Sequence, residues 1–278
     1  MSQCRLCGAD TKFFLFQKFG YRIVRCLDCN LIYTDFHPSR YFFDQYYSKN
    51  YFQAGGKKRS YSDYAAEEAA LRITFRKRAR RLRLPAQGQV LDLGCAYGFF
   101  LMELPPSWRK FGLEVSRYAA KLAQKNNPDA TIKNGTLKLA SFPNPKFDLV
   151  TLWDVIEHLD QPKKTLELVY RLLKPGGKIA LTTGDVDSVF AKLQGSHWHL
   201  YNPPQHLSFF SGRTLSGLLE TIGYKNIRAN HPAANYPLSY LLYKLKNLYR
   251  LPLSVPAFAQ KIIVPVNLGD IMFIEADK

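Results

Sequence analysis

The chain has 278 residues, 46% of them hydrophobic, and a formal net charge of +17. That length allows a full α/β core together with a smaller appended module. The sequence has no run of about 18 or more apolar residues, which argues against a spanning helix, and its first residues lack the apolar core of a signal peptide. The charge is compatible with nucleic acid, an anionic membrane surface or a phosphorylated substrate, and it does not choose among them.

Two C-x-x-C pairs lie near the N-terminus: Cys4 with Cys7, and Cys26 with Cys29. Two such pairs separated by 18 residues can place four thiolates around a tetrahedral zinc ion. We therefore predict a zinc ribbon over residues 1–40, with a thiol–disulfide site as the alternative. All four ligand positions would be taken, so the metal is expected to be structural. Paired cysteines without an export signal also favour a reducing, cytoplasmic location.

Residues 41–85 form a connector whose first part is rich in aromatic residues. Over residues 61–84 apolar side chains recur at helical spacing, at Leu71, Phe75, Ala79 and Leu82. The other faces of this expected helix are strongly basic. They form either a solvated surface or one that binds anions.

From residue 86 onward, predicted strands and helices alternate, which indicates a parallel sheet covered on both faces. The strands are expected at 89–93, 110–114, 130–133, 147–152, 178–183, 226–231 and 268–275, and the helices at 98–104, 117–126, 162–173 and 212–222. Two segments exceed what such a fold needs, at 184–210 and 232–266. Inserts of this kind build substrate sites at the carboxyl ends of strands.

Residues 90–98 (VLDLGCAYG) are the most informative stretch. An apolar strand carries Asp92 near its end and runs into a turn with Gly94 and Gly98, where a Cβ would obstruct the turn or a ligand. The spacing differs from the G-x-G-x-x-G of dinucleotide-binding proteins. Glu114 ends the next strand 22 residues after Asp92, where such folds place a carboxylate on ribose hydroxyls.

With three later segments in the same order, this turn resembles the class I S-adenosylmethionine-dependent methyltransferases. The later segments are 147–150 (FDLV), 153–159 (WDVIEHL) and 172–178 (LLKPGGK). The resemblance implies a Rossmann-like sheet of seven strands, the last antiparallel, over residues 86–278. It assigns Asp92, Gly94 and Gly98 to the methionine end of the donor and Glu114 to its ribose. Trp153 and Asp154 would border the adenosine and the methyl group.

On the acceptor side, His158 and His206 are the predicted catalytic residues, with His206 in a loop that follows the fifth strand. Together with the zinc ribbon, this order of modules is similar to bacterial sugar methyltransferases. Some of those enzymes have a glutamate before the catalytic histidine, where this chain has Gln205.

We predict methyl transfer to a small molecule, namely a nucleotide- or lipid-linked sugar or glycan precursor. The alternative is an RNA methyltransferase that grips phosphates with the zinc ribbon and the basic helix. Residues 238–249 form an amphipathic basic helix, which is either a lid or a peripheral contact with the inner membrane face. The sequence leaves the oligomeric state open.

Overall fold

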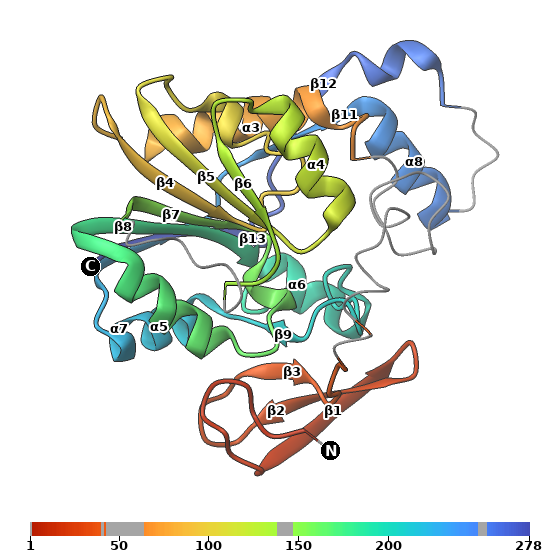
Figure 1. Cartoon of the computed structure of the whole chain (residues 1–278). Helices are drawn as coiled ribbons and strands as arrows, with labels where there is room; N and C mark the ends of the chain where they lie inside the picture. The colour runs from red at the N-terminus through yellow and green to blue at the C-terminus, as the bar shows by residue number, and fades with distance from the viewer. Residues whose placement is uncertain (1, 40–41, 43–63, 138–146, 250–254) are drawn as a thin grey trace.

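The computed structural model describes residues 2–39, 42, 64–137, 147–249 and 255–278. Its centre is a seven-stranded sheet in the order β10-β13-β8-β7-β4-β5-β6 (Figure 1). Only β13 runs antiparallel to its neighbours, which confirms the predicted fold class. The strands are β4 (Gly88–Leu93), β5 (Trp108–Glu114), β6 (Thr131–Asn134), β7 (Phe147–Trp153), β8 (Leu173–Gly184), β10 (Lys225–Asn230) and β13 (Ile271–Asp277). β8 begins before the residue 178 predicted for it.

Helices cover both faces of this sheet (Figure 1). α5 (Pro162–Leu172) and α7 (Gly212–Ile222) pack on one face, where their leucines join the inward side chains of β4, β7 and β8. α3 (Glu68–Arg81) and α4 (Arg117–Asn126) cover the other face. The alternating side chains of each buried strand thus supply both cores. Phe75 and Leu82 of the predicted stripe are buried in the second core.

The helix predicted at 98–104 does not form; only a 3-10 turn, η1 (Leu101–Glu103), is present. Gly98 is in the left-handed region with φ +77° and therefore cannot begin an α-helix. The next obstacle is Pro105, since a proline disfavours the helical conformation of the residue before it. Leu104 is accordingly extended. The segment between these residues is too short for an α-helix.

Both predicted inserts contain structure of their own. The segment 184–210 forms α6 (Val189–Gln194), η3 (Gly195–His197) and β9 (Ser208–Phe209). The segment 232–266 forms β11 (Ala234–Pro237), α8 (Leu238–Tyr249), η4 (Ala257–Gln260) and β12 (Ile263–Val266). β11 pairs with β12, and α8 contacts β11 and η4 of the same insert. Within the described ranges, no helix is long and apolar enough to cross a membrane.

The N-terminal region forms β1 (Lys12–Lys18), β2 (Tyr21–Cys26) and β3 (Ile32–Thr34). Its sheet has a fourth strand, β9, supplied by the insert after β8, so the order is β1-β2-β3-β9. Figure 1 shows this sheet lying below the helices α5 and α6. The aromatic part of the predicted connector, up to residue 63, lies almost wholly outside the described residues.

Candidate functional site

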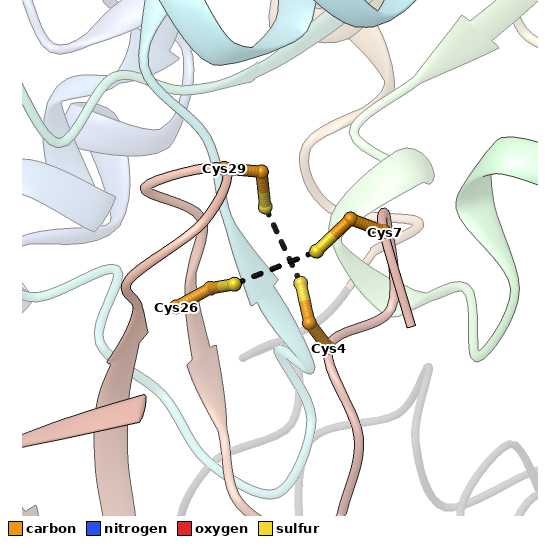
Figure 2. Close-up of side chains that lie close together, drawn as sticks. All are labelled: Cys4, Cys7, Cys26 and Cys29. Atoms are coloured by element: carbon orange, nitrogen blue, oxygen red, sulfur yellow. Dashed lines mark hydrogen bonds between the residues drawn. The ribbon is translucent and has the colours of Figure 1, made fainter. Parts of the chain in front are cut away.

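The four predicted metal ligands converge (Figure 2). The Sγ atoms of Cys4 and Cys29 are 3.4 Å apart, those of Cys7 and Cys26 are 3.5 Å apart, and all four sulfurs lie within 4.8 Å of one another. A zinc ion with Zn–S bonds of about 2.3 Å separates tetrahedral sulfurs by roughly 3.8 Å. A hydrogen bond donated by Cys29 lowers the pKa of Cys4 to about 5, which favours a thiolate. The cluster is compatible with a small zinc module.

The glycines of the turn after β4 occupy positions that only glycine suits. Gly94 and Gly98 have φ of +68° and +77°. A Cβ on Gly94 would lie 2.6 Å from Cγ2 of Val155, and one on Gly98 would lie 2.4 Å from Nδ2 of Asn127. Asn127 in turn donates a hydrogen bond to the carbonyl of Gly98, so the end of α4 fixes the turn. The sequence reasoning did not identify Asn127.

Asp92 and Glu114 lie at the carboxyl ends of adjacent parallel strands, as predicted. Thr151 donates a hydrogen bond of 2.7 Å to Asp92, while burial raises the pKa of that carboxyl to about 7. Glu114 accepts hydrogen bonds from the backbone N–H groups of Ala96 (2.9 Å) and Ser116 (2.8 Å), and burial raises its pKa. Glu114 therefore ties the glycine turn to the start of α4, and its remaining lone pairs are available to a ligand.

Trp153 and Asp154 follow at the end of β7. The indole of Trp153 is buried against Phe100 and lies beneath the guanidinium of Arg78, which is 5.1 Å from the ring centroid. Asp154 is exposed and has φ +54°, a conformation uncommon for a residue other than glycine. Strained residues of this kind cluster at functional sites. Arg78, on α3, was not predicted as a site residue.

Tyr64 precedes α3 and packs against the aromatic part of the turn. Its ring centroid lies 5.0 Å from that of Tyr97 and 5.5 Å from that of Phe99. Burial raises the pKa of Tyr64, and the charges of Asp92 and Glu114 act in the same direction. Tyr64, a residue of the connector, therefore packs directly against the turn of the predicted donor site.

The structure brings His158 and His206 together with Glu157. The two imidazoles meet edge to face with centroids 4.8 Å apart. One ligand atom from each of the three side chains lies within 4.8 Å of the others. Glu157 and His158 belong to η2 (Ile156–His158), which follows β7. His206 comes from the insert after β8, and its neighbour Leu207 donates its N–H to the carbonyl of Glu157 at 2.8 Å.

Backbone carbonyls contact both histidines. Nδ1 of His158 lies 3.0 Å from the carbonyl of Gln205, and Nδ1 of His206 lies 2.7 Å from that of Leu200. Because a carbonyl oxygen only accepts, Nδ1 carries the hydrogen in the neutral His206 ring and Nε2 keeps its lone pair, whereas the His158 ring also bonds to the backbone of Asp154. Burial lowers the pKa of His158 to about 4 and that of His206 to about 3. Both rings are therefore neutral at physiological pH.

A very small pocket, with room for about one water molecule, lies beside this cluster and is lined by Glu157, Thr183, Trp198, His206 and Ser208, among others. Oε2 of Glu157 and Oγ of Ser208 are buried, and neither has a hydrogen-bond partner among the described residues. Burial and the charge of Asp154 raise the pKa of Glu157 to about 8. These two atoms can therefore still form hydrogen bonds with a small polar ligand.

Besides the cysteine cluster, the described part of the chain has one other group of side chains that could hold a metal ion. It consists of Glu157, His158 and His206. His199 does not join it and lies 3.8 Å from Asp270. Glu157 could have been noticed because it directly precedes His158, whereas Thr183 and Ser208 had no signal in the sequence.

Comparison with known proteins gives one consistent result. Residues 64–229 match the methyltransferase-domain family. The chain is 30% identical to an uncharacterised protein of Methanocaldococcus jannaschii over 51% of this chain and 67% of that protein. It is 26% identical to the demethylmenaquinone methyltransferase of Lactobacillus johnsonii, over 53% and 72% of the two chains. The solved structure of an S-adenosylmethionine-dependent methyltransferase from Thermotoga maritima superposes with a TM-score of 0.54 at 20% identity, covering 77% and 92%.

Proposed function

This chain belongs to the S-adenosylmethionine-dependent methyltransferases, and we propose that it acts on a small molecule, namely a hydroxyl of a sugar or glycan precursor that is carried on a nucleotide or a lipid. In such a transfer the bond between the methyl carbon and the donor sulfur breaks as the acceptor oxygen bonds to that carbon. The acceptor then loses its proton. The enzyme aligns the two partners and accepts this proton.

For the donor, we propose that the backbone around Gly94 and Gly98 approaches the methionine end, together with Asp92. Glu114 accepts hydrogen bonds from the ribose hydroxyls through lone pairs that Ala96 and Ser116 leave free. Trp153 and Asp154 border the adenosine and the methyl group. The buried position of both carboxylates at adjacent strand ends supports this assignment.

For the acceptor, we propose that His206 takes the proton on Nε2 and that His158 supports it from the side. The observation that carries this assignment is the pair of neutral imidazoles, with Nδ1 fixed on backbone carbonyls, beside the pocket of Glu157. Ionisation of the Glu157 carboxyl would stabilise the imidazolium that forms. Glu157 would thereby supply the carboxyl group that, in some sugar methyltransferases, comes from a glutamate at the position of Gln205.

RNA stays the alternative acceptor, because part of the basic helix α3 is occupied by other contacts while Arg80 and Arg81 are exposed. Arg72 and Arg76 both bind Glu103 at 2.7 Å, and Arg78 is buried. Phosphate recognition needs accessible lysine and arginine side chains. A peripheral membrane contact through α8, on the cytoplasmic face, stays part of the proposal for a lipid-linked acceptor.

Methyl-labelled S-adenosylmethionine tests the proposal when the full chain is incubated separately with nucleotide sugars, membrane lipid extract and total RNA. We expect label in a sugar-containing product from one of the first two pools. Label in RNA, with binding that weakens steeply as salt rises, would support the alternative instead. A chain that binds the donor and labels none of the three pools would contradict both.

A further inference from the structure

The cysteine module is joined directly to the backbone that carries His206. Oγ1 of Thr34, at the end of β3, donates a hydrogen bond of 2.8 Å to the carbonyl of His206. The N–H of Thr34 donates one of 3.0 Å to the carbonyl of Leu207. β3 then continues along β9 by antiparallel pairing (Figure 1). One fully buried residue therefore holds two consecutive carbonyls, starting at the proposed catalytic histidine.

A second link starts inside the first metal-binding loop. Arg5 lies between Cys4 and Cys7, and its side chain is only 3% exposed. Its guanidinium donates a hydrogen bond of 3.1 Å to the carbonyl of Thr34. Nε of the same guanidinium lies 3.7 Å from the carboxylate of Asp160, two residues after His158. A single side chain of the cysteine loop thus contacts the segments that lead to both histidines.

The packing between the module and the insert after β8 is continuous. Cys4 and Cys26 are buried in the same apolar cluster as Phe210. The rings of Phe16 and Tyr201 meet with centroids 4.9 Å apart, and Lys18 donates hydrogen bonds to two carbonyls of the insert, both at 2.9 Å. The module and the insert therefore share one packed interface.

We propose that the four-cysteine module is the positioning element of the acceptor site, with Thr34 and Arg5 as the positioning residues that hold His206 and His158 against Glu157. The inference rests on the proposed function for the roles of the two histidines. His206 lies in a long insert whose only strand, β9, spans two residues. Loops of this kind move unless they are tied down, and catalytic groups must be held within about 0.5 Å of their productive place. Four sulfurs around a metal would fix the loop that carries Arg5. Through its contacts with Thr34 and Asp160, Arg5 would then restrain the segments of His206 and His158.

Thr34→Val tests the link because valine has the shape of threonine without its hydroxyl, and Thr34→Ser is the matched control that keeps the hydroxyl. The ring nitrogen signals of His206 and His158 are followed by NMR through a pH titration of the zinc-loaded full chain. Zinc content and the affinity for S-adenosylhomocysteine are measured on the same samples. Arg5→Met, which keeps an apolar stem, tests the second link.

In Thr34→Val we expect the His206 ring to titrate at higher pH than in the wild type, because its buried position loosens. Zinc content and donor affinity should stay within about twofold, and turnover of the labelled pool should fall roughly tenfold. Thr34→Ser should restore the wild-type titration. Arg5→Met should move the signals of His158 as well.

Unchanged ring signals in both Thr34→Val and Arg5→Met, with zinc bound, would overturn the proposal. If Thr34→Val does not fold, Arg5→Met alone decides it by the same signals. Shifted rings in a chain that methylates no pool would keep the positioning link and remove the proposed function. If the chain methylates a sugar pool but the histidine ring signals do not shift in either variant, the proposed function would stand and the positioning link would be removed.

Discussion

The donor half and the acceptor half of the site are built in different ways. Asp92, Gly94, Gly98 and Glu114 all lie within one strand–turn–strand segment, and β4 pairs with β5 in parallel. The acceptor half joins chain segments that are far apart in sequence: 47 residues separate His158 from Gln205, and 172 separate Thr34 from His206. Local chain geometry thus sets the centre of the donor half, which Trp153 and Asp154 complete from the end of β7, whereas long-range packing sets the acceptor half.

The two halves share one electrostatic feature. Burial raises the pKa values of Asp92 and Glu114 in the donor half and of Glu157 in the acceptor half, and it lowers those of both histidines. Burial therefore favours the neutral form of each of these five groups. A bound sulfonium favours ionisation of nearby carboxyls, so charge would develop in the site when the donor arrives.

The largest expected effect separates the halves most sharply. His206→Ala should lower turnover by about 10²- to 10⁴-fold, because a general base is lost. The affinity for S-adenosylhomocysteine, measured by calorimetry, should not change. His197→Ala is the control, since that histidine is exposed in the same insert. Full activity of His206→Ala would move the base to His158 or elsewhere.

The next effect concerns pH and the free energy of unfolding. The pKa of Glu157 is raised from 4.5 to about 8, so the folded chain holds this proton more tightly than the unfolded chain. Its contribution to stability is therefore present below about pH 4.5 and is lost as the pH rises through 8. Glu157→Gln should gain roughly 3 to 4 kcal/mol over the wild type when urea unfolding near pH 8 is compared with unfolding near pH 5.

The exposed carboxylate of Glu220 supplies the control for that experiment, because Glu220→Gln should leave the pH dependence as it is. The contribution of His206 to the free energy of unfolding has the opposite pH dependence. Its pKa is lowered from 6.5 to about 3, so its contribution is lost as the pH falls through that interval. A wild-type stability that stays flat from pH 5 to 8, relative to Glu157→Gln, would show that Glu157 is ionised in the folded chain.

A smaller effect is expected in the donor half. Glu114→Gln keeps one accepting oxygen for the buried N–H groups of Ala96 and Ser116 but loses the charge that strengthens hydrogen bonds to ribose. Donor affinity should weaken about tenfold, the loss of roughly 1.4 kcal/mol that follows from a weaker charge-assisted bond. Calorimetry with S-adenosylhomocysteine measures it, and thermal unfolding checks the fold. Unchanged affinity would remove Glu114 from the ribose site.

The smallest effect lies outside both halves. Arg76→Leu removes a half-exposed partner of Glu103, which Arg72 still binds. The free energy of unfolding should change by less than about 1 kcal/mol, because exposed ion pairs contribute little. Donor affinity and turnover should match the wild type. A large loss of RNA binding in this variant would instead favour the alternative acceptor.

The sequence by itself determined the sheet, the glycine turn and the carboxylates at its edge, because strand periodicity and turn chemistry act between near neighbours. It also predicted that the four cysteines come together, because their spacing is typical of a zinc site. It failed at residues 98–104, where the left-handed Gly98 and the proline at 105 leave no room for a helix.

Only the tertiary structure decided how the acceptor site is assembled. No spacing could show that β9 joins the N-terminal sheet or that Thr34 holds the carbonyl of His206. The same is true of the raised pKa of Glu157, which burial produces and the sequence does not encode locally. Contacts between distant segments depend on the packing of the whole chain, and so do the desolvation and pKa shifts that they cause.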